Sequence, residues 1–287
     1  MTAPLLQLDD IRVAFPGKGF RAAPTEVLHG VSLHIGEGET LGVVGESGSG
    51  KTTIGRTVLG LVSPSSGTVR LRGEDITHLS GRARRALAAD VQVVFQDPYT
   101  SLNPSMEIGE ILAEPLVVLG SPRSDARARV KELLDRVGLP ADAIHRRPRE
   151  FSGGQRQRIA IARALAPEPR LIVCDEPVSA LDLSTQARVI DLLLEIQRDT
   201  GVAYLFISHD LAVVRHISHR VAVLYRGDVV EEGPAAAVTL EPEHPYTQRL
   251  LLAAPVADPW AQEKRRAERI RLREQHRGQH EQAGATA

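Results

Sequence analysis

The sequence predicts an α/β fold, in which a sheet is covered by helices on both of its faces. Short apolar runs rich in β-branched residues alternate with segments whose apolar residues recur at helical spacing. The chain has 287 residues, of which 42% are hydrophobic and 25% charged, so it can bury a sizeable core. We expect one folded unit over about residues 5–260 and a charged, flexible tail over 261–287.

The strands are predicted from apolar runs that Gly and Pro clusters separate. These runs are Leu5–Phe15, Val27–Ile35, Leu41–Val44, Val69–Leu71, Val91–Phe95, Leu171–Cys174, Ala203–Ile207 and Val221–Tyr225.

Helices are predicted where apolar residues fall at positions i, i+3, i+4 and i+7. The two clearest sets are Val130, Leu133, Leu134 and Val137, and Val189, Leu192, Leu193 and Ile196. Ser124 is the expected N-cap of the first of these helices. The stretch of about 97–169 has few strand signals, and we expect it to form a helical subdomain.

Composition and charge exclude several classes of protein. A net charge of −1 gives no bulk attraction to nucleic acid, and 3% aromatic residues leave little material for stacking on bases. The single cysteine, Cys174, can form neither an internal disulfide nor a four-cysteine metal site. No apolar run approaches the roughly 18 residues of a membrane span, and the N-terminus lacks a signal-peptide pattern. We therefore expect a chain that neither crosses a membrane nor is secreted.

A glycine-rich loop between a strand pattern and a helix pattern predicts a phosphate-binding site. Gly45–Thr52 matches the spacing G-x-x-x-x-G-K-S/T, and its glycines let backbone amides turn toward phosphate oxygens. Lys51 would add positive charge near the β- and γ-phosphates, and Thr52 would place a hydroxyl on Mg²⁺. The predicted phosphate-binding residues are Gly45, Glu46, Ser47, Gly48, Ser49, Gly50, Lys51, Thr52 and Thr53.

Two carboxylates follow the apolar run that ends at Cys174. Asp175 is predicted to hold Mg²⁺, and Glu176 to orient and deprotonate an attacking water. Taken alone, this pair could equally be an acidic turn after a core strand. The phosphate-binding loop upstream in the same α/β pattern favours the catalytic interpretation.

A second anion-binding helix start follows Phe151. Ser152 is the expected N-cap, and Gly153 and Gly154 come directly after it. A single nucleotide does not need two such sites, so this one could serve a nucleotide held by another subunit. The alternative is a capped helix with a basic surface.

These motifs, in this order, resemble the nucleotide-binding subunit of an ATP-binding-cassette (ABC) transporter. The matched motifs are Walker A at Gly45–Thr52, the Q-loop at Gln96, the signature at Phe151–Gln155, Walker B at Leu171–Glu176, the D-loop at Ser179–Asp182 and the switch histidine His209. The resemblance implies a P-loop NTPase (RecA-like) core with an N-terminal antiparallel β subdomain and an inserted helical subdomain. A P-loop GTPase is disfavoured because the chain lacks an Asn-Lys-x-Asp motif.

The resemblance implies roles for residues of one subunit around ATP. Glu176 would be the general base, and His209 would contact the γ-phosphate and help position the attack. Gln96 would contact Mg²⁺ or the attacking water, and Lys51 would bind the phosphates. The implied Mg²⁺ ligands are Thr52, Gln96 and Asp175. Taken alone, Gln96 could be a solvated residue at a strand end and His209 an ordinary loop histidine.

The resemblance also places ATP between two subunits packed head to tail. The residues that would act across this interface are Ser152, Gly153, Gly154, Gln155 and Asp182. Taken alone, Asp182 could be a helix N-cap. Phe15 would stack on the adenine, and Phe20 is the other candidate for this contact. The alternative is that Phe15 is an ordinary phenylalanine of the core.

Two further segments resemble the dipeptide, oligopeptide and nickel importer family. These are Gln96–Pro104 and His244–Leu251, the latter within an expected C-terminal extension at about 233–260. The Gln-Asp-Pro sequence that begins at Gln96 resembles the Q-loop of the second of that family's two ATPase subunits. The chain cannot carry the iron–sulfur cluster of many members, because it has no cysteine beyond Cys174.

The family resemblance implies an ATPase that energises the import of di- or oligopeptides from the cytoplasmic face of the cell membrane. The implied partners are a sibling or identical ATPase subunit, two transmembrane permeases and an extracytoplasmic substrate-binding protein, with no nucleic acid. Nickel or glutathione-type import is the alternative cargo. A soluble ABC ATPase without a transport role is the alternative function.

Overall fold

The computed structural model describes residues 3–17, 23–97 and 101–253. Phe20 and the tail at 261–287 lie outside the described residues. None of the helices in the described part of the chain combines the length and apolar character that a bilayer-spanning helix requires.

The centre of the molecule is a six-stranded sheet with the order β10-β9-β3-β8-β7-β6. Its strands are β3 (Thr40–Val44), β6 (Val91–Val94), β7 (Leu171–Asp175), β8 (Ala203–Ile207), β9 (Arg220–Tyr225) and β10 (Asp228–Pro234). β10 is antiparallel to β9, and the other neighbours are parallel. Every residue of β3 and β8 is buried, which agrees with their continuous apolar sequences.

A second sheet of four antiparallel strands lies beside the first, with the order β2-β1-β4-β5. Its strands are β1 (Leu6–Phe15), β2 (Thr25–Ile35), β4 (Ser66–Leu71) and β5 (Glu74–Asp75). Helix α1 (Lys51–Val58) buries Ile54 and Val58 in one apolar cluster with residues of both sheets. The expected N-terminal antiparallel β subdomain and α/β core are therefore confirmed.

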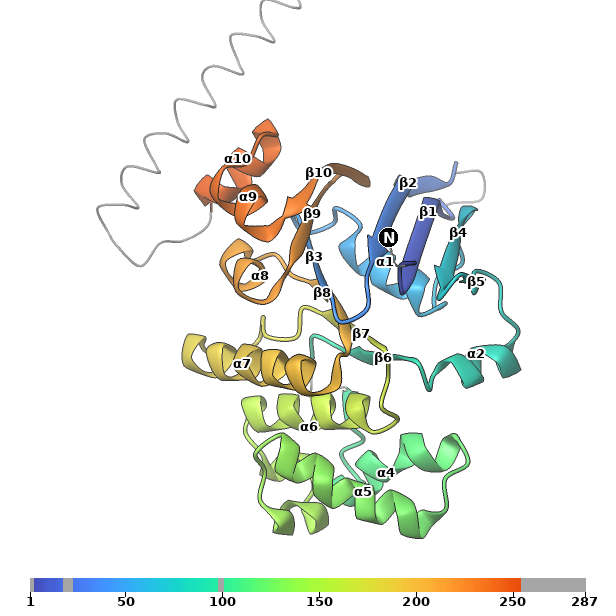
Figure 1. The fold of residues 1–287 in the computed structure, drawn as a ribbon, viewed down its shortest axis with the longest axis vertical. Helices are drawn as coiled ribbons and strands as arrows, with labels where there is room; N and C mark the ends of the chain where they lie inside the picture. Colours follow the sequence, from blue (N-terminus) through green and yellow to red (C-terminus); the bar gives the residue numbers. More distant parts are fainter. Residues whose placement is uncertain (1–2, 18–22, 98–100, 254–287) are drawn as a thin grey trace, which may run out of the picture.

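The helices of residues 108–165 lie at the lower end of the molecule in Figure 1, below the sheet, whereas the helices of residues 235–253 lie at its upper end. The remaining helices are α2 (Gly81–Leu87), α4 (Ile108–Val118), α5 (Arg123–Arg136), η1 (Ala141–His145), η2 (Pro148–Glu150), α6 (Gly153–Leu165), α7 (Leu183–Thr200), α8 (Leu211–Ile217), α9 (Ala235–Leu240) and α10 (Pro245–Ala253). Helices α4 to α6 fall within the expected helical subdomain at 97–169. The subdomain boundaries and the C-terminal extension at about 233–260 stay predictions.

The predicted apolar face of α5 is correct, but its predicted N-cap is wrong. Val130 and Val137 are fully buried in the core, as the spacing requires. The helix begins at Arg123 after Pro122, so Ser124 lies inside its first turn. Pro122 has the extended backbone of a helix cap, and the Ser124 hydroxyl donates to the Asp125 carboxylate at 2.9 Å.

Strand β10 is not predicted from the sequence. A two-residue turn, Arg226-Gly227, joins β9 to β10, and both residues have positive φ (49° and 89°). This backbone matches the twist of an antiparallel hairpin. The strand has no strong apolar alternation, and all of its residues are at least partly exposed, so its pattern resembles that of a loop.

Candidate nucleotide-binding site

The predicted site residues gather at one edge of the six-stranded sheet. The parallel strands β3, β7, β8 and β6 all end there, as their registers require. Their carboxyl ends lead into Gly45, Glu176, His209 and Gln96 respectively. Ligands bind at this edge of open α/β sheets.

The phosphate loop between β3 and α1 is tightly packed on one side and open on the other. A Cβ on Gly45 would lie 2.1 Å from the carbonyl oxygen of Leu224, so only glycine lets the loop pass this close to β9. Gly48 has open space where a Cβ would be, and its φ of +81° lies in the region that glycine favours. The buried Ser49 hydroxyl has no hydrogen-bond partner among the described residues. This cradle with an orphaned hydroxyl fits phosphate oxygens.

Lys51, at the first position of α1, points back across the loop. Its Nζ donates to the carbonyls of Gly45 and Glu46, both at 2.8 Å, and the residue is 5% exposed. Burial lowers the pKa of Lys51, while the carboxylates of Glu176 and Asp175 oppose that shift. The first-turn amides of α1 lack intrahelical partners and add partial positive charge. The loop therefore concentrates donors and positive charge in one place.

Thr52 and Asp175 face each other across the sheet edge. The Thr52 hydroxyl donates to Asp175 Oδ1 at 3.0 Å. Burial raises the pKa of Asp175, and the bond from Thr52 acts against that rise. A hydroxyl and a carboxylate are the hard oxygen ligands that Mg²⁺ prefers, and phosphates and water complete such sites. In the described ranges no group of three His, Cys, Asp or Glu side chains could hold a metal ion. A Mg²⁺ site of the kind proposed needs no such group, because phosphates and water supply its other ligands.

Glu176 and His209 form a second pair at the same edge. His209 Nδ1 lies 3.1 Å from Glu176 Oε2, with side-chain exposures of 58% and 18%. The Glu176 backbone has a φ of 50°, and its amide donates to the Ile207 carbonyl at 2.9 Å. The strained turn and the histidine together fix the carboxylate, while Oε1 stays available as a proton acceptor. Both residues are predicted from the sequence, but their contact is not.

The signature segment lies apart from this edge, at the start of α6. Ser152 is the N-cap as predicted, and its hydroxyl accepts from the Gln155 amide at 3.3 Å. A Cβ on Gly154 would lie 2.3 Å from Cγ2 of Thr185 on α7. No hydrogen bond that the structure describes joins 152–155 to the phosphate loop of the same chain.

Asp182 caps α7 beside the signature segment. Its carboxylate accepts from the Thr185 amide at 3.0 Å and from the hydroxyls of Ser184 and Thr185, both at 2.7 Å. These hydrogen bonds lower the pKa of Asp182. The helix N-cap considered as an alternative is thus present in the structure, and a role across an interface stays a prediction.

Comparison with known proteins gives the family of this chain. The model of a family described as "ABC transporter" matches residues 28–179. This chain belongs to the ABC transporter family. Its fold and matched region are those of the family's ATPase domain.

Several relatives within the ABC family are similar over most of this chain. The glutathione import ATP-binding protein GsiA of Escherichia coli (strain K12) is 52% identical over 268 residues, which are 92% of this chain and 43% of that protein. GsiA of Shigella dysenteriae serotype 1 (strain Sd197) is 56% identical over 237 residues, 82% of this chain and 38% of that protein. The chain thus spans less than half the length of these relatives.

Solved ABC structures share the fold. The dimeric structure of MJ0796, a bacterial ABC transporter cassette, has a TM-score of 0.71 and 29% identity and covers 80% of this chain and 98% of its own. The cbiO1 protein from Clostridium perfringens, part of the ABC transporter complex cbiONQ, has a TM-score of 0.74 and 27% identity and covers 83% and 91%.

Two expected ATP contacts of the ABC family are exposed in this structure. Gln96 follows the end of β6 and is exposed at the sheet edge. Phe15 ends β1 opposite Thr25 and is 40% exposed, so the alternative of a core phenylalanine is wrong. Its stacking on adenine stays a prediction.

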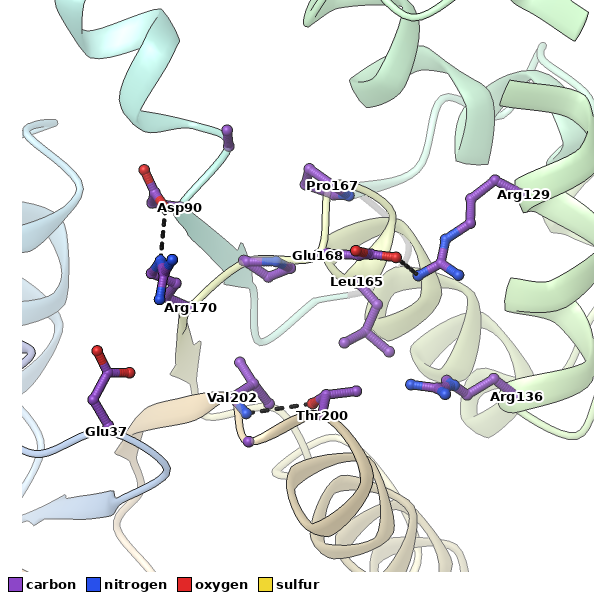
Figure 2. Close-up of a pocket in the computed structure, with 13 residues that line it drawn as sticks. Glu37, Asp90, Arg129, Arg136, Leu165, Pro167, Glu168, Arg170, Thr200 and Val202 are labelled. Carbon is purple, nitrogen blue, oxygen red and sulfur yellow. Dashed lines mark hydrogen bonds and ion pairs between the residues drawn. The ribbon is translucent and has the colours of Figure 1, made fainter. Parts of the chain in front are cut away.

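A cavity of about 590 Å³ lies at the opposite edge of the sheet from the phosphate loop, near the starts of β6, β7 and β8 (Figure 2). Its rim carries the ion pairs Arg129–Glu168 at 3.0 Å and Arg170–Asp90 at 3.4 Å. None of the predicted site residues lines it. The cavity is therefore separate from the candidate nucleotide site.

Proposed function

We propose that this ABC ATPase domain hydrolyses ATP with Mg²⁺ to energise an importer. The arrangement at the sheet edge carries the proposal: a buried lysine in the phosphate loop, a Thr52–Asp175 pair suited to Mg²⁺, and the Glu176–His209 pair. Phosphoryl transfer needs these elements, which are charge neutralisation and an aligned nucleophile.

In the proposed hydrolysis some residues would bind ATP and Mg²⁺, and others would accept the proton of the attacking water. Lys51 and the amides of the phosphate loop would bind the phosphates of ATP, while Thr52 and Asp175 would hold Mg²⁺. The metal would neutralise charge on the β- and γ-phosphates. As water attacks the γ-phosphorus and the bond to the β-phosphate oxygen breaks, Glu176 would accept the water proton, leaving ADP and phosphate. His209 would hold that carboxylate in place.

A head-to-tail pair of ATPase subunits would complete the site. Ser152 is exposed and Gly154 half-buried at the start of α6, with no described hydrogen bond to the phosphate loop of their own chain. Such a start attracts anions and would approach the γ-phosphate bound by a second subunit. The name of MJ0796 as a dimeric cassette supports this arrangement. The second subunit would be a sibling or an identical chain, and closing the pair would couple hydrolysis to motion.

The cargo we propose is a small peptide, with glutathione-type tripeptides favoured by the names of the GsiA relatives. The partners would be two transmembrane permeases and an extracytoplasmic substrate-binding protein. The chain would act at the cytoplasmic face of the membrane.

The experiment is to tag the full chain carrying Glu176→Gln, trap it with Mg-ATP, extract it from membranes and identify what co-purifies. The matched control is the same Glu176→Gln chain extracted from membranes without added nucleotide. We expect two permeases, with a sibling ATPase or a second copy of this chain. Partners that include no permease, with none of the chain at the membrane, would refute the transport role and leave the ATPase chemistry standing.

A further inference from the structure

The C-terminal helix α10 reaches the phosphate loop through one tyrosine. Tyr246 is 2% exposed, and its hydroxyl accepts a hydrogen bond from the backbone amide of Glu46 at 2.9 Å. These two residues are 200 positions apart in the chain. The sequence around Tyr246 shows a family resemblance but by itself implies no role for the tyrosine.

The bond acts on the peptide unit whose carbonyl accepts a hydrogen bond from Lys51. The amide of Glu46 and the carbonyl of Gly45 belong to one planar peptide, so fixing the N–H also fixes the direction of the carbonyl. That carbonyl accepts from Lys51 Nζ at 2.8 Å, as does the next one, of Glu46. Tyr246 therefore sets the orientation of a group that holds the ammonium in the loop.

Tyr246 is itself held rigidly by the sheet. Its ring packs against Tyr225 at the end of β9, with centroids 4.2 Å apart. The Glu231 carboxylate on β10 accepts from the amides of Glu243 and His244 at 2.9 and 3.1 Å, and His244 Nδ1 accepts from the Tyr246 amide at 3.1 Å. Figure 1 shows α10 and α9 at the β9–β10 end of the sheet.

The β9–β10 hairpin holds the far side of the same loop. The amide of Gly227 donates to the Ser49 carbonyl at 3.0 Å. The loop is thus fixed at two points, one near each end, by groups that lie outside its own motif. A loop held in this way loses less conformational freedom when it closes on phosphates.

We propose that Tyr246 is a positioning residue for nucleotide binding, which acts through the Gly45–Glu46 peptide and makes the C-terminal helix part of the phosphate site. The inference rests on the proposed ATPase function. Because coupling between sites is reciprocal, nucleotide binding should also slow backbone hydrogen exchange in α10.

The test compares Tyr246→Phe with a matched tyrosine variant in the full chain. Tyr204→Phe is the control, because Tyr204 is fully buried in β8 and its hydroxyl donates to the Leu193 carbonyl at 3.1 Å, away from the loop. Each variant is titrated with Mg-ADP and a non-hydrolysable ATP analogue. We expect Tyr246→Phe to weaken both affinities about fivefold, the effect of one net hydrogen bond, and Tyr204→Phe to leave them unchanged.

Two further measurements separate positioning from general stability. In Tyr246→Phe the KM for ATP should rise while kcat stays near its original value, because the hydroxyl touches no reacting atom. Mg-ADP should slow hydrogen exchange over 245–253 in the unaltered chain and in Tyr204→Phe, but not in Tyr246→Phe. Equal affinities in Tyr246→Phe and the unaltered chain, or equal losses in both variants, would overturn the inference. Failure of the unaltered chain to bind ATP would instead refute the proposed function, and the inference with it.

Discussion

Replacement of Glu176 by glutamine should remove the proton acceptor of the reaction while leaving the phosphate site intact. Glu176 Oε2 is 3.1 Å from His209 Nδ1, so an amide of the same size can keep that contact while losing its basicity. The neighbouring Asp175 faces the Thr52 hydroxyl at 3.0 Å and is the proposed Mg²⁺ ligand, so we do not expect it to replace Glu176 as the proton acceptor.

The expected loss of turnover lies within the range of a missing general base. That range is about 10²- to 10⁴-fold. With no second carboxylate in place we expect about 10³-fold, equivalent to ~4 kcal/mol in the activation barrier. ATP affinity should change little, because the phosphates are proposed to be bound by Lys51 and the loop amides and not by Glu176.

Steady-state phosphate release and equilibrium ATP binding measure the two effects separately. Glu195→Gln on the exposed face of α7 is the matched control, and its turnover should equal that of the unaltered chain. Turnover of Glu176→Gln within about fivefold of the unaltered chain would refute the assignment of Glu176 as the base.

Three other predictions follow from contacts around the site. Lys51→Ala should weaken ATP binding about tenfold or more by titration, since a charged donor is lost, and unchanged affinity would contradict its role. Gly154→Ala should lower the free energy of unfolding by about 1–3 kcal/mol in urea denaturation, because its Cβ would lie 2.3 Å from Thr185 Cγ2, and adding Thr185→Ser should restore stability. No loss in the single variant would refute the clash. Asp182→Ala should lower the free energy of unfolding at neutral pH, because hydrogen bonds to the ionised Asp182 carboxylate stabilise the folded chain and lower its pKa. The difference in unfolding free energy between the variant and the unaltered chain should shrink as pH falls below about 4, the usual pKa of Asp in an unfolded chain. A difference independent of pH between 2 and 7 would contradict this.

Local patterns predicted most of the secondary structure and the chemical identity of the site. The strand before Gly45, the strand ending at Asp175 and the helix capped by Ser152 depend on short-range preferences that the sequence displays directly. The error at Ser124 has the same local origin, because Pro122 supplies the extended residue before the helix and competes with serine for the cap.

Contacts between distant segments could not be predicted in this way. The Glu176–His209 pair joins the ends of β7 and β8, and it exists because those strands are parallel neighbours in register. The packing of Gly154 against Thr185 depends on how α6 lies on α7. Neither spacing along the chain nor residue type contains that information.

The sequence by itself determined which residue types stand in short motifs suited to bind phosphate, hold Mg²⁺ and accept a proton, and their roles stay predictions. Only the tertiary structure decided which groups act together, because the sheet order brings the ends of β3, β7 and β8 to one edge. It also brought Tyr246 to the phosphate loop across 200 positions, where its hydroxyl accepts from the amide of the peptide whose carbonyl accepts from Lys51.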